Sequence, residues 1–219
     1  MCHLVFLVCV SSMKKIKNGF FMCVEGIDGS GKSLFAKSLN QELLNDGYVT
    51  LLTREPGGTP LGERIRALLF DKQTPPCSKA EFLLFAASRA QHCHDLIAPA
   101  LAEEKIVISD RMADSSLVYQ GYVRGLSLDL IRSVNNWAMD DLKPTIIFYL
   151  KVDARTAFNR ISQRAIERCD FEDSLVPLEK AIDGFDTIFA GNKTVITLDA
   201  TQTPQNVLDQ GMQALRALL

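Results

Sequence analysis

Short apolar runs alternate with amphipathic stretches along most of the chain. Five of these runs favour buried strands: 20–24, 48–53, 106–108, 145–150 and 195–198. A helical period is predicted between and after them, over residues 34–44, 61–70, 78–104, 128–139, 154–168, 173–190 and 204–219. The longest of these helices is expected to bend near Pro99. This alternation favours an α/β fold, in which helices cover both faces of a parallel sheet.

A glycine-rich segment directly follows the first predicted strand. Its residues Gly26-Ile27-Asp28-Gly29-Ser30-Gly31-Lys32-Ser33 fit the pattern G-x-x-x-x-G-K-[ST] of a phosphate-binding loop. Glycines let several backbone N–H groups face one anion, and the following helix presents its positive end to the same place. Lys32 supplies an ammonium group for the outer phosphates, and the Ser33 hydroxyl can hold Mg²⁺. Because strand, loop and helix follow in the required order, we predict a nucleotide-phosphate site rather than a chance turn.

Two further polar segments follow predicted strands. Residues 54–59 follow the second strand, and Ser109, Asp110 and Arg111 follow the third. Because such folds bind ligands at the carboxyl ends of parallel strands, both segments are candidates for the same site as the glycine-rich loop. For Asp110 and Arg111 taken alone, an ordinary loop ion pair is the competing interpretation, and a site is favoured.

Two groups of residues share a face of a predicted helix. Phe85 and Arg89 are four positions apart, so both can face one side of the helix. The alternative is that Phe85 is an ordinary core residue and Arg89 an ordinary surface residue. Arg160, Arg164 and Arg168 form a basic row with the same spacing. For any one of these arginines, a solvated basic face is the competing interpretation.

Length and charge limit the function only weakly. A chain of 219 residues suits one domain, and a formal net charge of -2 gives no reason to expect nucleic acid or a membrane as partner. Residues 4–10 are apolar but too few to span a bilayer, and lysines follow them, whereas a secretory signal has its charges first. We expect residues 1–18 to be a disordered N-terminal extension and residues 19–219 a single domain, with Met13 as a natural alternative start.

The cysteines indicate no metal or redox motif. Six of them are scattered along the chain without a C-x-x-C pair. Reduced thiols and a cytoplasmic location are therefore expected. His92, Cys93 and His94 are not expected to bind a metal, because neighbouring positions on a helix point in different directions.

Four segments together resemble the thymidylate kinase family: residues 25–33, 54–59 (R-E-P-G-G-T), 85–92 (F-A-A-S-R-A-Q-H) and 110–121, which starts D-R and ends Y-Q-G. Many kinases share the first, but the second and fourth together are far more specific. The resemblance runs from about residue 20 to the last helix. It implies a P-loop NTPase-type three-layer sandwich with a five-stranded parallel sheet, a helical lid at about residues 153–173, and a homodimer. It also implies transfer of the γ-phosphoryl group of ATP to dTMP, with Mg²⁺, in dTTP biosynthesis.

The resemblance assigns the donor side to the glycine-rich loop. All eight residues from Gly26 to Ser33 would bind ATP, and Lys32 would grip its phosphates. Asp28 would lie between donor and acceptor, close to the metal. Ser33, Asp28 and Asp110 are the implied Mg²⁺ ligands.

The resemblance also implies an acceptor site. The phosphate would be held by Arg54 and Arg111, the base by Phe85, Arg89 and Ser116, and the sugar by Tyr119, with Gln120 also among the residues that bind dTMP. Phe85 would stack on thymine, and Arg89 would donate a hydrogen bond to its carbonyl. Arg111 is expected to act in catalysis, together with Lys32 and Asp28.

The chain departs from the family pattern at three places. Met112 replaces the usual aromatic residue or histidine, Ser88 replaces a frequent aspartate, and residues 170–172 (D-F-E) lack a common lid arginine. The variable positions of the phosphate loop, residues 27–30, also contain no arginine. We therefore expect the basic row to supply the missing charge, with Arg164 as the catalytic lid residue.

Two other functions stay open. One is a P-loop nucleoside monophosphate kinase with a different acceptor, against which Phe85 and Arg89 argue because they suit a pyrimidine. The other is a non-catalytic nucleotide-binding module. Such a module has no reason to keep Arg54, Asp110 and Arg111 together.

Overall fold

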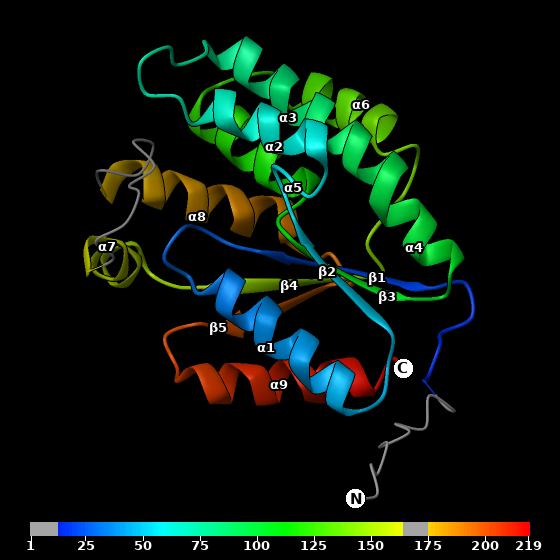
Figure 1. Cartoon of the computed structure of the whole chain (residues 1–219). Coiled ribbons are helices and arrows are strands. Elements are labelled where there is room, and N and C mark those ends of the chain that lie inside the picture. Colours follow the sequence, from blue (N-terminus) through cyan, green and yellow to red (C-terminus); the bar gives the residue numbers. More distant parts are fainter. Residues whose placement is uncertain (1–12, 164–174) are drawn as a thin grey trace, which may run out of the picture.

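The structure, a computed structural model, describes residues 13–163 and 175–219 (Figure 1). Within these residues, five parallel strands form one sheet in the order β2-β3-β1-β4-β5. The strands are β1 (Phe20–Glu25), β2 (Thr50–Arg54), β3 (Ile106–Asp110), β4 (Ile146–Lys151) and β5 (Val195–Asp199). They match the predicted ranges closely, so the predicted five-stranded parallel sheet is confirmed.

The central strand β1 is buried along its whole length. It pairs with β3 on one side and β4 on the other, so that Cys23 lies opposite both Ser109 and Ile147. A parallel strand between two neighbours is covered on both faces, which explains its continuous apolar sequence. The pairing also brings the carboxyl ends of β1 and β3 together, so the glycine-rich loop begins beside Asp110.

Helices form a layer on each face of the sheet (Figure 1). One face is covered by α1 (Lys32–Asn45) and α9 (Pro204–Arg216). The other side of the sheet carries α2 (Pro60–Leu69), α3 (Ser78–His92), η1 (Cys93–Ile97), α4 (Ala98–Ala102), α5 (Ala113–Ser116), η2 (Leu117–Val123), α6 (Leu128–Ala138) and α8 (Leu175–Phe189). A further helix, α7 (Ala154–Gln163), follows β4. No helix among the described residues is long and apolar enough to cross a bilayer.

Aromatic side chains link the sheet to both helical layers. On one face, Phe35 of α1 packs edge-on against Phe148 of β4, with ring centroids 5.3 Å apart. The next residue of the strand, Tyr149, faces the other layer, where its ring centroid lies 5.4 Å from that of Phe185 in α8. Successive residues of a strand point to opposite faces, so β4 holds the two layers together.

Two irregular helical segments differ from a regular α-helix. The predicted helix 78–104 contains the π-helical turn η1 directly before Pro99. The proline ring clashes with the carbonyl four residues earlier, so a regular α-helical turn cannot form there. The distortion expected near Pro99 is therefore a π-helical turn. The second segment, α5 followed by the π-helix η2, was not assigned to any element from the sequence. Its polar residues and Gly121 hide the helical period.

The N-terminal segment meets the domain earlier than the predicted boundary at residue 19. The backbone of Lys14 accepts a hydrogen bond from the N–H of Val49 and donates one to the carbonyl of Gly47. The N–H of Ile16 donates to the carbonyl of Glu104. Lys14 and Ile16 therefore contact the domain, whereas residues 1–12 lie outside the described part of the chain.

Candidate active site

The glycine-rich loop connects β1 to the first turn of α1. Gly26 has φ 143° and Gly31 has φ 93°, which favour glycine, and a Cβ atom at Gly26 would lie 2.6 Å from the carbonyl oxygen of Leu150. Lys32 is buried, and its Nζ donates to the carbonyl of Ile27 at 2.6 Å and lies 3.5 Å from Oδ1 of Asp28. The ammonium group is thus held over the loop, where it can meet phosphate oxygens.

Ser33 and Asp110 meet at the edge where β3 ends and α1 begins. The Ser33 Oγ donates to Oδ2 of Asp110 at 2.5 Å. Mg²⁺ prefers oxygen ligands and is often bound by one or two carboxylates together with substrate phosphates, so this pair fits a nucleotide-bound Mg²⁺ ion. Asp28, the third predicted ligand, bonds to Arg111. Among the residues that the structure describes, no three His, Cys, Asp or Glu side chains group as a metal site.

Arg111 lies directly on the glycine-rich loop. Its Nη1 donates to the carbonyl of Gly26 at 3.1 Å and to Oγ of Ser115 at 3.1 Å, and its Nη2 donates to Asp28. The guanidinium carbon lies 5.3 Å from the centre of the Tyr119 ring, within the range of a cation–π contact. The backbone of Arg111 has φ 73°, an uncommon value for a residue with a side chain. The local structure therefore determines both the backbone and the side chain of this arginine.

Arg54 is placed at the end of β2 by a separate ion pair. Its Nη2 donates to Oε2 of Glu63 in α2 at 3.0 Å, and its side chain remains 54% exposed. The backbone N–H of Gly58 also donates to Glu63, and this bond together with the Arg54 charge lowers the pKa of that carboxyl. Glu63 thereby holds Arg54 against the loop of residues 54–59 while leaving it accessible.

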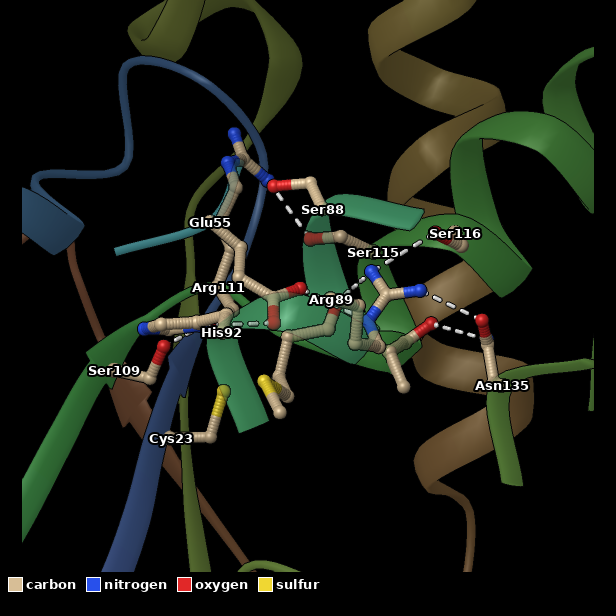
Figure 2. A network of polar contacts seen from close by, with 12 residues as sticks. Cys23, Glu55, Ser88, Arg89, His92, Ser109, Arg111, Ser115, Ser116 and Asn135 are labelled. Carbon is tan, nitrogen blue, oxygen red and sulfur yellow. Dashed lines mark hydrogen bonds and ion pairs between the residues drawn. The ribbon is translucent and has the colours of Figure 1, made fainter. Parts of the chain in front are cut away.

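Arg89 is the centre of a buried polar network (Figure 2). The side chain is 1% exposed, and its Nε donates to Oε2 of Glu55 at 2.9 Å. Its Nη1 donates to Oδ1 of Asn135 at 2.6 Å, and its Nη2 to Oγ of Ser116 at 3.2 Å and to the carbonyl of Met112 at 3.4 Å. A guanidinium has five N–H groups. Four of them are bonded within the protein here, and the second Nη1 hydrogen has no acceptor among the described residues.

Glu55 ties Arg89 to the loop after β2. Its second oxygen, Oε1, lies 3.1 Å from Nδ1 of His92 (Figure 2). Nε2 of His92 lies 2.7 Å from Oγ1 of Thr53. Ser88 accepts a hydrogen bond from the N–H of Gly57 at 3.2 Å. The loop and α3 are therefore fixed to each other on both sides of Arg89.

The sequence assigned no role to Glu55 or Asn135. Glu55 belongs to the R-E-P-G-G-T segment, so its position in this motif could have marked it as a site residue. Asn135 lies on the predicted helix 128–139, and nothing in its neighbourhood marks it. Its Nδ2 donates to the carbonyl of Ala113 at 3.2 Å, so this one side chain joins α6, α5 and Arg89.

The other predicted acceptor residues occupy different surroundings. Phe85 is half-buried one turn before Arg89 on α3, so the two share a side of that helix. Tyr119 packs edge-on against Phe185, at 6.4 Å between ring centroids. Gln120 is buried and donates to Glu81 at 2.7 Å. Adjacent helix positions point in different directions, so η2 sends Tyr119 toward Arg111 and Gln120 into the packing with α3.

The predicted lid is described only in its first part. Arg164 and Arg168 lie outside the described residues, as do residues 170–172. In α7, Nη1 of Arg160 donates to the carbonyl of Gly29 at 3.4 Å. A Cβ atom at Gly29 would lie 2.4 Å from the carbonyl oxygen of Ala157, so α7 lies directly against the glycine-rich loop.

Two acids interact with Arg111 and Arg89: Glu25, which is completely buried, and Asp114, which is partly buried. Burial raises the pKa of Glu25, and the charge of Asp114 raises it further, whereas Arg111 lowers it. Burial likewise raises the pKa of Asp114, against the opposing charge of Arg89. Burial thus disfavours the charged form of both acids, and the positive charges of Arg111 and Arg89 oppose this effect only in part.

Comparison with known proteins identifies relatives that match nearly the whole chain. The family model described as thymidylate kinase matches residues 24–210. A thymidylate kinase from Finegoldia magna is 37% identical over 198 residues, which cover 90% of this chain and 97% of the relative. One from Mycoplasma pneumoniae is 37% identical over 214 residues, which cover 93% and 97%. The crystal structure of thymidylate kinase from Ehrlichia chaffeensis superposes with a TM-score of 0.74 at 32% identity, covering 90% of this chain and 98% of that chain.

Proposed function

Because the chain belongs to the thymidylate kinase family, we infer that it transfers the γ-phosphoryl group of ATP to dTMP and so forms dTDP and ADP for dTTP synthesis. The observation that supports this function best is the contact of Arg111 with the glycine-rich loop. The guanidinium bonds to Asp28 and to the carbonyl of Gly26. A phosphate on Arg111 would therefore lie next to phosphates on the loop, and phosphoryl transfer depends mainly on such positioning and on charge neutralisation.

On the donor side, we propose that the backbone of residues 26–33 and the ammonium of Lys32 bind the ATP phosphates. Ser33, Asp110 and Asp28 would hold Mg²⁺, which when bound neutralises charge on the phosphate oxygens. The hydroxyl of Ser33 and the carboxylate of Asp110 already lie 2.5 Å apart. Asp28 contacts Lys32 and Arg111, so it stands between the donor and acceptor sides.

On the acceptor side, we propose that Arg111 and Arg54 hold the phosphate and Tyr119 packs on the sugar. Phe85 would stack on the base, and the remaining N–H of Arg89 would donate to a base carbonyl. Ser116 acts on the base through Arg89, which it contacts directly. Gln120 stays among the proposed acceptor residues: its Nε2 donates to Glu81, and its buried Oε1 has no hydrogen-bond partner among the described residues.

The acceptor preference tests this function. We expect dTMP to be the best acceptor and dUMP to be weaker by roughly 10- to 200-fold in kcat/KM, because a missing methyl group costs about 1–3 kcal/mol in an apolar pocket. The measurement is ADP release, coupled to an indicator reaction, with a panel of nucleoside monophosphates.

The same panel separates the alternatives. Equal efficiency with CMP or AMP would indicate a kinase for another nucleotide, because a single donor N–H on Arg89 suits a carbonyl better than an amino group. Absence of ADP release with every acceptor would indicate a nucleotide-binding module. Family membership favours neither outcome.

The lid arginines are the subject of a separate prediction. The variable positions of the glycine-rich loop contain no arginine, and we propose that Arg164 supplies this positive charge in addition to Lys32. Arg164→Ala should then lower turnover by roughly 10²-fold or more, while the affinity for dTMP stays nearly constant. Arg160→Ala and Arg168→Ala are measured beside it, since Arg160 already contacts Gly29. Arg155→Ala, an exposed arginine of α7 outside the row, is the matched control. Wild-type turnover in all three row variants would exclude the lid as the source of this charge.

We further propose that the chain forms a homodimer through α2, α3 and α6. These helices pack next to one another, and their large exposed apolar residues are Leu61, Leu68, Leu83, Leu130 and Trp137. The two members of each pair on α2 and α6 are seven positions apart and so share a helix face. A second copy of the chain would cover this apolar surface.

We also propose a single domain that works in the cytoplasm. The cysteines that the structure describes as free, Cys23, Cys77 and Cys93, agree with a reducing compartment. The packing of Lys14 and Ile16 suggests that this domain starts near Met13 rather than at residue 19.

A further inference from the structure

Glu25, the last residue of β1, is a completely buried carboxylate directly before the glycine-rich loop. Its Oε1 accepts a hydrogen bond from the backbone N–H of Met112 at 2.8 Å. Its Oε2 accepts one from Oγ of Ser115 at 2.6 Å. The thiol of Cys23 lies 3.6 Å from Oε1. Both strong donors belong to the segment that follows β3, so Glu25 connects the first strand to that segment.

The residue between these contacts is Arg111. Its backbone has φ 73°, and it is fixed from both sides: its own N–H donates to the carbonyl of Val24, and the next N–H, that of Met112, donates to Glu25. A non-glycine residue at such a φ angle costs free energy unless its surroundings determine it. Glu25 therefore helps to hold the backbone from which the Arg111 side chain extends.

A second connection runs through Ser115. Its Oγ donates to Glu25 and accepts from Nη1 of Arg111 at 3.1 Å. A hydroxyl has one hydrogen to donate. Because Glu25 takes that hydrogen, the lone pairs of Ser115 are directed to the guanidinium. The carboxylate thus orients Arg111 at its backbone and at its side chain without touching the place where a phosphate would bind.

A buried carboxylate is costly, and packing alone would favour an apolar residue at the end of a central strand. We propose that Glu25 is a positioning residue for Arg111, and that it acts through Ser115 and the Met112 amide to form the binding site of the acceptor phosphate. This role rests on the proposed function, because it assigns Arg111 to the acceptor. Glu25 is expected to matter for dTMP and much less for ATP, since none of its contacts involves Lys32 or Ser33.

The test compares the two substrates in Glu25→Gln, which keeps the size of the side chain but removes its charge and one acceptor. The KM for dTMP should rise by about tenfold or more, as expected for the loss of a hydrogen bond to a charged group, while the KM for ATP changes by less than about twofold. Ser115→Ala breaks only the side-chain connection and should change the KM for dTMP in the same direction. In the double variant the two effects should not add, because they act on the same guanidinium.

Cys23→Ala is the matched control, because it perturbs the same buried place but leaves both connections to Arg111 intact. It should lower the melting temperature without changing the ratio of the two KM values. If Glu25→Gln fails to fold, Ser115→Ala alone decides. Equal changes in both KM values, or additive effects in the double variant, would overturn the positioning role. Wild-type protein inactive with dTMP would instead reject the proposed function, so the two failures are distinguishable.

Discussion

Replacing Lys32 by alanine is expected to abolish phosphoryl transfer and leave the fold intact. The Lys32 ammonium is held over the glycine-rich loop by the carbonyl of Ile27 and by Asp28. There it can neutralise charge on the transferring group in a site where little water competes. We expect turnover to fall by roughly 10³-fold or more, with the melting temperature nearly unchanged. Steady-state ADP release and thermal unfolding are measured on the same preparation.

Lys37→Ala is the matched control for this substitution. Lys37 belongs to the same helix but is exposed, and it should retain wild-type turnover. Near-normal turnover in Lys32→Ala would falsify the assignment of the loop to phosphate binding.

The second large effect is expected for Arg111. Arg111→Ala should lower kcat/KM for dTMP by roughly 10²-fold or more, because it removes the guanidinium proposed to hold the acceptor phosphate and also the partner of Asp28. Arg111→Lys keeps the charge but loses the two-pronged geometry, so it should recover only part of the activity. Both variants are compared by kcat/KM for dTMP and by the KM for ATP.

Arg132→Ala serves as the control, since Arg132 is an exposed arginine of α6 that pairs with Asp129. It should behave like the wild-type protein. If Arg111→Ala raised the KM for ATP and left kcat/KM for dTMP unchanged, Arg111 would belong to the donor side. The acceptor site would then have to be placed elsewhere.

The fold was largely predictable because its signals are local. The apolar runs of β1 and β4 can only be buried strands, and the glycine pattern before Lys32 fixes the turn between β1 and α1. The π-helical segment η2 was not predictable in the same way. Its seven residues, L-V-Y-Q-G-Y-V, are apolar on several sides around Gln120 and Gly121, so no single apolar stripe of period 3.6 is visible.

The site was predictable only for residues inside motifs. Lys32 and Asp28 come from the glycine-rich loop and Arg111 from the segment after β3, and the structure brings the two motifs together. Asn135 could not be found, because its role depends on a contact with Arg89 across 46 positions of the chain.

Motifs also do not predict in which direction a side chain points. Tyr119 and Gln120 are neighbours in the motif, but Tyr119 contacts Arg111 whereas Gln120 donates to Glu81, because adjacent positions on η2 face different partners. A motif fixes which residues occur, whereas the packing of α3 against η2 decides which of them face the site.

The most direct measurement follows the phosphoryl group itself. Purified protein is incubated with ATP labelled in the γ-phosphate, Mg²⁺ and dTMP, and the labelled products are separated by chromatography. Transfer to dTMP predicts label in dTDP, in amounts equal to the ADP formed, and none with Lys32→Ala. Label that remains in ATP or appears only as free phosphate, while dTMP is recovered unchanged, would contradict thymidylate kinase activity.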